Sequence, residues 1–255
     1  MKEGVMKMRR WSGTWLLLLA CVLLPLPARA LGPDAVNTGF IIDFNEQWLR
    51  EDAVNRTLSQ ARKDMQPRER HQAGGGSDVK TDILWTGSLR LHEGRLFLND
   101  EGVHKLANMF PSQQYVQAYD AFTQIIASFN ENVERLYKVP PENVATGVAA
   151  LLAGGYAAYH NKPFPDAWVR PVVRQVDALL RQKPELFEGK TVYKRESYQV
   201  SVGIGMLLLM TQTELAKQKG ADASALKAAG AQVLASTLGA PPERIVFSAS
   251  GFRVR

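Results

Sequence analysis

Cysteine is almost absent from this chain, which carries one such residue, Cys21, among 255. A single thiol cannot form an intramolecular disulfide bond, and cysteine metal sites need several thiols at short spacing. Cys21 lies in an apolar N-terminal run, so removal of that run as an export signal leaves a mature chain without a thiol. The sequence therefore excludes disulfide frameworks, thiol nucleophiles and cysteine metal sites, and it suits an oxidising compartment.

Recognisable catalytic motifs are also missing. No two histidines have the spacing of helical metal ligands, and neither HExxH nor GxSxG occurs. Glu131 and Glu134 lie three residues apart on a predicted helix, which is typical of a solvated helix face. We therefore predict no metal and no cofactor, and no set of catalytic residues can be read from the chain. The four histidines are His71, His92, His104 and His160.

The one strongly apolar run at the N-terminus has the layout of an export signal. A basic segment, Lys2 to Arg10, precedes an apolar run from Trp15 to Pro27. The small residues Ala28 and Ala30 then occupy the two positions that a signal peptidase recognises. These features predict a signal peptide over residues 1–30, cleaved after Ala30, and a periplasmic or secreted protein. Two alternatives stay open: an uncleaved anchor, and a lipoprotein that is lipid-anchored through Cys21.

The mature chain has little excess charge of either sign. The net charge of the whole chain is +6, but residues 1–30 hold five Lys/Arg and one Glu, so four of these charges belong to the predicted signal peptide. A nucleic-acid-binding protein needs a clustered basic face. The sequence therefore predicts no nucleic-acid partner.

Residues 31–112 are predicted to form an N-terminal arm. Apolar residues recur at three- and four-residue steps over about 46–65 and predict one amphipathic helix. The polar stretch 66–80 contains three consecutive glycines and is typical of a linker. Leucines alternate with polar residues over 83–100, which predicts a short β-hairpin. The stripe of the predicted helix consists of Trp48, Leu49, Ala53, Val54, Leu58, Ala61 and Met65.

Residues 113–255 keep a helical period almost to their end and are predicted to form a helical domain. Proline, asparagine, aspartate and glycine mark the helix boundaries, with Pro140–Asn143 starting one helix, Asp166 capping the next and Gly239 ending the last. The predicted helices span about 113–137, 140–160, 166–182 and 192–218, and a last one begins at Asp222 or Ser224 and ends at Gly239. Residues 244–254 are predicted to form an extended tail. The predicted fold class is mainly α: a helical bundle with a short β-hairpin and an N-terminal arm.

The helix after Asn143 is rich in alanine and glycine and has no charge from Val144 to Tyr159. Ridges of small residues allow a second helix backbone to come close, and Ser197–Gln212 carries a matching ridge. Both runs are shorter than the roughly 20 residues that a membrane span needs. We therefore predict a buried helix pair in a soluble bundle and no integral span in the mature chain. The ridges are Ala145, Ala149, Ala153 and Ala157 beside Thr146, Ala150, Gly154 and Ala158, facing Ser197, Ser201 and Gly205.

Polar rings gather at the end of this helix. Tyr156, Tyr159 and His160 follow one another within its last turns, and Tyr198 begins its predicted partner. If the two helices run antiparallel, these four side chains lie close together and form the rim of a pocket. The alternative is a rim of half-buried aromatic residues that closes the core.

Three segments taken in order resemble an uncharacterised bacterial family, a domain of unknown function. They are LYKVPPENVATGVAALLAGGYAAYH, YKRESYQVSVGIGMLLLMTQTELAK and the closing LGAPPERIVFSASGF, and the resemblance covers about residues 113–252. Members of this family look like exported, mainly helical proteins. The resemblance implies a helical fold and export, and it assigns no role to any residue.

The leading functional hypothesis is a non-enzymatic binding or structural module of the cell envelope or the secreted fraction. Its partner is predicted to be an unidentified protein or a small apolar ligand. The alternative hypothesis is a periplasmic hydrolase whose active site is too dispersed along the chain to be recognised.

Overall fold

The computed structural model describes residues 82–255 except 88, 93–94 and 219. The predicted signal peptide, the helix predicted over 46–65 and the linker 66–80 lie outside the described residues. Within the described part the fold is mainly α, as predicted. Its helices are α4 (Glu101–Ala107), α5 (Tyr115–Tyr137), α6 (Val144–His160), α7 (Asp166–Leu180), α8 (Thr191–Lys217) and α9 (Ser224–Leu238).

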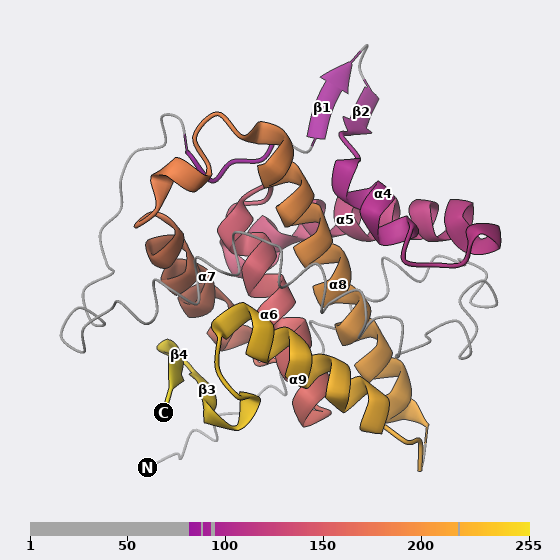
Figure 1. Ribbon diagram of the computed structural model, residues 1–255, viewed down its shortest axis with the longest axis vertical. Helices are drawn as coiled ribbons and strands as arrows, with labels where there is room; N and C mark the ends of the chain where they lie inside the picture. Colours follow the sequence, from indigo (N-terminus) through magenta and orange to yellow (C-terminus); the bar gives the residue numbers. More distant parts are fainter. Residues whose placement is uncertain (1–81, 88, 93–94, 219) are drawn as a thin grey trace, which may run out of the picture.

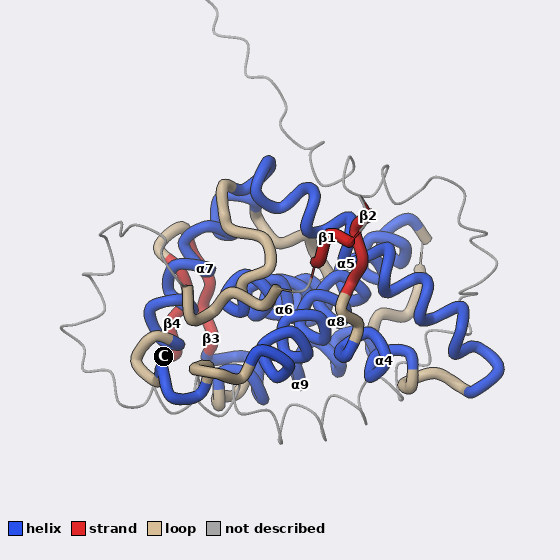
Figure 2. The backbone as a smooth tube through the Cα atoms, turned by 90° about the horizontal axis from the view of Figure 1, so that it is seen from above, coloured by secondary structure: helices blue, strands red, loops and turns tan. Residues whose placement is uncertain are grey.

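Two antiparallel hairpins accompany these helices and lie far apart in both views (Figure 1 and Figure 2). The predicted hairpin within 83–100 is confirmed, with β1 (Leu89–His92) paired to β2 (Arg95–Leu98). The predicted extended tail is a second hairpin, β3 (Ile245–Ser248) and β4 (Gly251–Val254). Both the N–H and the carbonyl of Phe252 bond the side-chain amide of Gln175, which attaches this hairpin to α7.

Helix α6 is the centre of the bundle, surrounded by α7, α8 and α9 (Figure 1). Every residue from Val144 to Ala158 is buried. The close approach predicted between α6 and α8 is confirmed, because a Cβ added to Gly154 would lie 2.7 Å from the Cα of Gly205. Helix α9 approaches the other side of α6 in the same way, since a Cβ on Gly230 would lie 2.6 Å from the carbonyl oxygen of Gly155.

Helices α6 and α8 run parallel, so the antiparallel arrangement considered from the sequence is wrong. Gly147 near the start of α6 faces Tyr198 near the start of α8, and Gly154 faces Gly205 seven residues farther along both helices. The cause is α7, which lies between them in sequence. It returns the chain to the start of α6 before α8 begins, so two reversals restore the original direction.

The start of α6 differs from the prediction in one respect. Asn143 caps the helix and its side-chain oxygen accepts the N–H of Ala145 at 2.9 Å, as expected for a helix-start residue. Pro140 lies outside the helix, however, because Glu142 takes a left-handed conformation with φ 52° and turns the chain before the cap. Asp166 is likewise the first residue of α7 and not its cap, which is Pro165.

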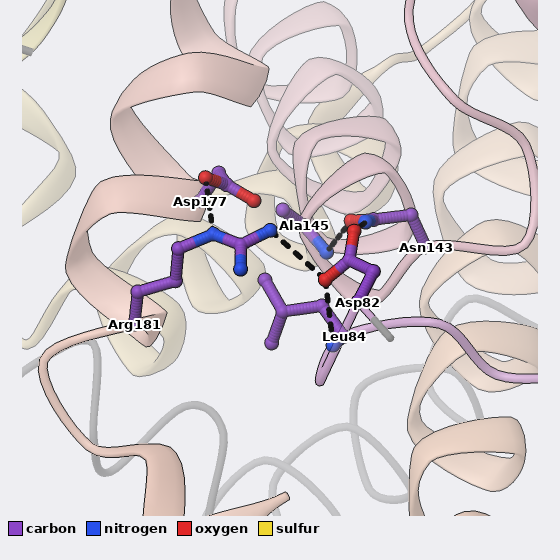
Figure 3. Close-up of polar contacts among 6 residues, drawn as sticks. All are labelled: Asp82, Leu84, Asn143, Ala145, Asp177 and Arg181. Carbon is purple, nitrogen blue, oxygen red and sulfur yellow. Dashed lines mark hydrogen bonds and ion pairs between the residues drawn. The ribbon is translucent and has the colours of Figure 1, made fainter. Parts of the chain in front are cut away.

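The first described residues are attached to the same core. Thr86 N–H donates to the Glu142 carbonyl and Val144 N–H to the Leu84 carbonyl, a short antiparallel bridge that buries Leu84 completely. Asp82 accepts hydrogen bonds from Leu84 N–H, the Asn143 amide and Arg181 (Figure 3). Arg181 also binds Asp177 on α7, so this carboxylate cluster joins the chain start to α6 and α7.

Helix α4 was not predicted, and it is joined to α8 by charge and close packing. Lys105 pairs with Glu196 at 2.6 Å, and Arg195 pairs with Glu101 at 2.5 Å. The N–H of Gly102 donates to the side-chain oxygen of Gln199. Helix α4 thereby buries its apolar residues in the same core as the later helices.

Candidate functional site

A small apolar groove lies beside α6 in the described part of the chain. Four elements and one loop residue line it, and their side chains recur at helical spacing on each helix. Only one hydroxyl of α5 and one of α6 belong to the lining. The lining residues are Phe129, Val133 and Tyr137 on α5; Thr146, Ala149, Ala150 and Ala153 on α6; Phe164; Val169 and Val173 on α7; and Met206 and Leu209 on α8.

The floor of this groove consists of alanine. Ala149, Ala150 and Ala153 are buried like the other residues of α6 around them, with 5% to 8% of their surface exposed. Larger side chains at these positions would fill the space between α5 and α7. Small side chains at these positions of α6 thus leave a narrow space between α5, α7 and α8.

The size of the groove limits what it can hold. The space open to the centre of a water molecule is about 30 Å³, whereas a cavity that binds benzene in a protein core measures about 150 Å³. A ring therefore does not fit without rearrangement. Met206 and Leu209 form one wall, and the flexible thioether of methionine allows that wall to adapt to a narrow ligand.

The polar groups at the edge of the groove already have partners. The hydroxyl of Tyr137 donates to Asp166 at 3.3 Å, which ties the end of α5 to the start of α7. Burial, together with the neighbouring Asp166 carboxylate, raises the pKa of Tyr137 well above its usual range. Thr146 donates to the Pro140 carbonyl at 2.7 Å. Both hydroxyls of the lining are therefore engaged within the fold, and the rest of the lining is apolar.

Three of the four predicted rim residues do lie together. The ring of Tyr156 is 4.4 Å from that of His160, and the ring of Tyr159 is 4.9 Å from it, centre to centre. Phe164, Trp168 and Phe247 pack edge-on against Tyr156. Tyr156 is buried in this cluster, so it closes the core between α6, α7 and the β3–β4 hairpin.

His160 lies at the surface edge of this aromatic cluster, and its pKa is lowered. Burial lowers the pKa of His160, and the nearby Lys162 and Lys227 lower it further. The two lysines also lie over aromatic faces, Lys162 above Tyr156 and Lys227 above Tyr159.

Tyr198 lies at the other end of α6 and is fully buried. Its hydroxyl donates to the side-chain oxygen of Asn130 and accepts the N–H of Glu142 at 3.2 Å. Burial raises the pKa of Tyr198 above its usual range. The residue thus holds the left-handed turn before α6 and takes no part in a rim with the other three.

The comparison with known families adds one finding. A model for a family of unknown function, DUF6683, matches residues 41–255. The chain belongs to DUF6683. Neither the curated proteins nor the solved structures yield a match to it. The predicted resemblance to an uncharacterised domain family is confirmed. The DUF6683 match begins at residue 41 and not near residue 113, where the resemblance was expected to begin, so the matched range includes the predicted helix 46–65.

A second polar cluster of this DUF6683 member escaped prediction. His104 on α4 contacts Tyr115 through Nδ1 at 2.5 Å and Asp100 through Nε2 at 3.2 Å, so both ring nitrogens have partners. The Tyr119 hydroxyl donates to the same Asp100 carboxylate at 2.6 Å, which raises the pKa of Tyr119 to about 12. The available signals were two four-residue spacings, Asp100 to His104 and Tyr115 to Tyr119.

Among residues 82–255, the described histidines and acidic residues form no group of three or more that could bind a metal ion. In the same part of the chain, no helix has both the length and the apolar character that a membrane crossing needs.

Proposed function

We propose that this DUF6683 protein is a non-enzymatic binding module whose groove beside α6 holds a narrow apolar chain. The observation that carries the proposal is the narrow apolar space over Ala149, Ala150 and Ala153, between apolar walls from α5, α7 and α8. A concave apolar site with few polar groups is the usual form of a small-molecule site.

The chemistry of the lining favours a linear alkyl chain over other apolar ligands. The space holds only about two water-sized groups, so an alkyl chain enters only if the Met206 and Leu209 wall moves, but it needs a smaller movement than an aromatic ring does. The hydroxyls of Tyr137 and Thr146 are engaged by Asp166 and Pro140. Each buried methylene group contributes about 0.8 kcal/mol. We therefore expect affinity to increase with alkyl chain length until the chain is longer than the groove.

The test is a titration of the full chain with a dansyl-labelled fatty acid, followed by its fluorescence. Val169→Glu places a charge on a partly buried wall position of α7, and Ala167→Glu places the same charge on an exposed position of the same helix. The proposal predicts that Val169→Glu abolishes binding and Ala167→Glu leaves it unchanged. Equal binding by both variants, or no binding by the unaltered chain, would overturn the proposal.

We also propose that the protein acts after export, in the periplasm or outside the cell. The support is the predicted signal peptide over residues 1–30, with lipid attachment at Cys21 as the alternative. Intact mass and N-terminal sequencing of the protein recovered from cells decide between them. A chain that starts at Leu31 supports export, a lipidated Cys21 supports the anchor, and an unprocessed N-terminus contradicts both.

A hydrolase remains the second candidate, now on the Asp100–His104–Tyr115 cluster. A histidine held between a carboxylate and a hydroxyl has the arrangement that general-base catalysis uses. Ester substrates tested with the full chain and with His104→Gln examine it. Turnover that depends on His104 and is unaffected by Val169→Glu favours the hydrolase over the binding module.

A further inference from the structure

The histidine cluster between α4 and α5 brings three different metal-binding groups together. Nε2 of His104 lies 3.2 Å from Oδ2 of Asp100, and the hydroxyl oxygen of Tyr119 lies 2.6 Å from the same Oδ2. An imidazole, a carboxylate and a phenol therefore meet at one carboxylate oxygen. The described histidines and acidic residues alone form no group of three, so a metal site at this place depends on the tyrosine as its third donor.

The separations of these atoms match those around a small metal ion. Nitrogen and oxygen ligands bind such ions at about 2.1 Å, so neighbouring ligands of an octahedral ion lie about 3.0 Å apart. The two distances in the cluster, 3.2 Å and 2.6 Å, lie on either side of this value. An ion bound to Oδ2 of Asp100 therefore reaches His104 and Tyr119 after small movements of the side chains.

Two helices hold the donors in place. Asp100 precedes α4 and lies four residues before His104, while Tyr115 and Tyr119 lie four residues apart on α5, so each pair shares one helix face. Helix α4 is itself held to α8 by two ion pairs and a hydrogen bond. Ligands carried by rigid helices keep their geometry more precisely than ligands on loops.

Tyr115 fixes the far side of the imidazole. Its hydroxyl contacts Nδ1 of His104, so Nε2 is turned towards Asp100. A histidine that binds a metal usually has its other ring nitrogen held by such a partner, which sets the orientation of the ring. Tyr115 is therefore a positioning residue, and His104, Asp100 and Tyr119 are the ligands.

The charge and exposure of the cluster suit a cation. Among the described residues no lysine or arginine pairs with Asp100, and the nearby Lys105 is neutralised by Glu196 at 2.6 Å. The side chains of His104 and Asp100 keep 52% and 37% of their surface exposed. An ion can therefore enter from solvent and keep further small ligands on its open side.

The donor set favours Fe(III) over other ions. Tyrosine binds a metal as phenolate, and iron is held by a tyrosine in the haem site of catalase. Imidazole also suits iron, whereas magnesium and calcium prefer oxygen ligands alone. Structural zinc sites are built mainly from cysteine and histidine, and this cluster has one histidine and no cysteine.

We propose that His104, Asp100 and Tyr119 bind one Fe(III) ion, with water or a small oxygen-donor ligand at its remaining positions. On binding, the O–H bond of Tyr119 breaks, an Fe–O bond forms, and the proton passes to solvent. The site is independent of the groove beside α6. It is an alternative to the hydrolase, because a metal on Nε2 of His104 leaves that nitrogen no lone pair for general-base catalysis.

Titration of the full chain, without an added histidine tag, with the nitrilotriacetate complex of Fe(III) tests the site. Phenolate bound to Fe(III) absorbs visible light, so the colour reports on Tyr119 directly. We expect a saturable absorption band at one iron per chain in the unaltered chain and in the control Tyr159→Phe, whose hydroxyl contacts Glu243 instead. Tyr119→Phe should give no band. A colourless unaltered chain, or an undiminished band in Tyr119→Phe, overturns the proposal.

Two further variants separate the ligands from the positioning residue. Tyr115→Phe should keep the band and bind iron about 10- to 100-fold more weakly. Asp100→Asn removes the anionic oxygen that the other two ligands share, so it should abolish the band, and it replaces Tyr119→Phe if circular dichroism shows that variant to be unfolded. A band that is lost in Tyr115→Phe and kept in Asp100→Asn contradicts the assignment. Calorimetric binding of Zn(II) through His104, without a band from Fe(III), also overturns it.

Discussion

The contact between Gly154 and Gly205 makes a sharp prediction for Gly154→Ala. The new Cβ would lie 2.7 Å from the Cα of Gly205 and 2.8 Å from its carbonyl carbon. An ordinary carbon–carbon contact is about 3.5 Å or more, so α6 and α8 must separate by roughly 1 Å. Because the atoms in the way are backbone atoms, no change of rotamer relieves the clash.

Two opposing effects set the size of the change in stability. Overpacking of a well-packed core decreases the free energy of unfolding by about 1 to 3 kcal/mol, and a backbone clash belongs at the upper end. Alanine is a better helix former than glycine by about 1 kcal/mol, which offsets part of the loss. We therefore expect Gly154→Ala to decrease the free energy of unfolding by about 2 kcal/mol.

Urea denaturation followed by circular dichroism measures this decrease. Gly189→Ala is the control, since its added Cβ has no heavy atom within 4 Å and its left-handed φ of 68° gives only a conformational penalty of about 1 kcal/mol. Gly205→Ala should resemble Gly154→Ala, and the double variant should lose less than the sum, because one separation of the helices serves both. A Gly154→Ala chain that is more stable than the unaltered chain would refute the close contact.

Three further predictions concern polar groups around the bundle. Tyr198→Phe removes the hydroxyl that accepts the Glu142 N–H in a buried site. We therefore expect urea denaturation to show a free energy of unfolding that is lower by about 1 to 3 kcal/mol. An unchanged value would contradict the role of Tyr198 in the turn. Asn143→Ala removes the α6 cap and the bond to Asp82, so it should lower the free energy of unfolding by about 1 kcal/mol or more. Asn143→Ser keeps a capping oxygen and should lower it by a smaller amount. Equal decreases for the two variants would refute the capping argument. Because the folded-state pKa of His160 is lowered, the folded chain binds fewer protons at this site than the unfolded chain, so this contribution to stability is present above about pH 6.5 and decreases as the pH falls below it. His160→Gln should remove that decrease, and an NMR titration should give a His160 pKa that rises towards its usual value in Lys162→Ala; an unperturbed pKa in the unaltered chain would contradict the prediction.

The close packing of α6 on α8 could be predicted because small residues at four-residue spacing form a ridge that lets two helix backbones meet. Helix direction could not be predicted, since Ser201 and Gly205 form the same ridge whichever way α8 runs. Only the path of the chain through α7 decides it. Helix α4 escaped prediction because seven residues give too little periodicity. Its Asp100–His104 contact was missed with it.

The groove could not be predicted from the sequence either. A ridge of alanines allows another helix to come close, but it does not specify whether a helix packs against that side of α6. In the structure Gly154 meets Gly205 of α8, while Ala149, Ala150 and Ala153 form the floor of the groove. Tyr198 illustrates the converse: a tyrosine expected at a pocket rim is fully buried beneath the turn that precedes α6.

Methyl NMR of the full chain during titration with decanoate tests the central proposal, that the groove beside α6 binds an alkyl chain. The predicted result is that the methyl signals of Val169, Val173 and Leu209 shift in a saturable way, while the buried Val202, which does not line the groove, keeps its position. Shifts confined to other parts of the chain, or no saturable shift at any groove methyl, would contradict the proposal.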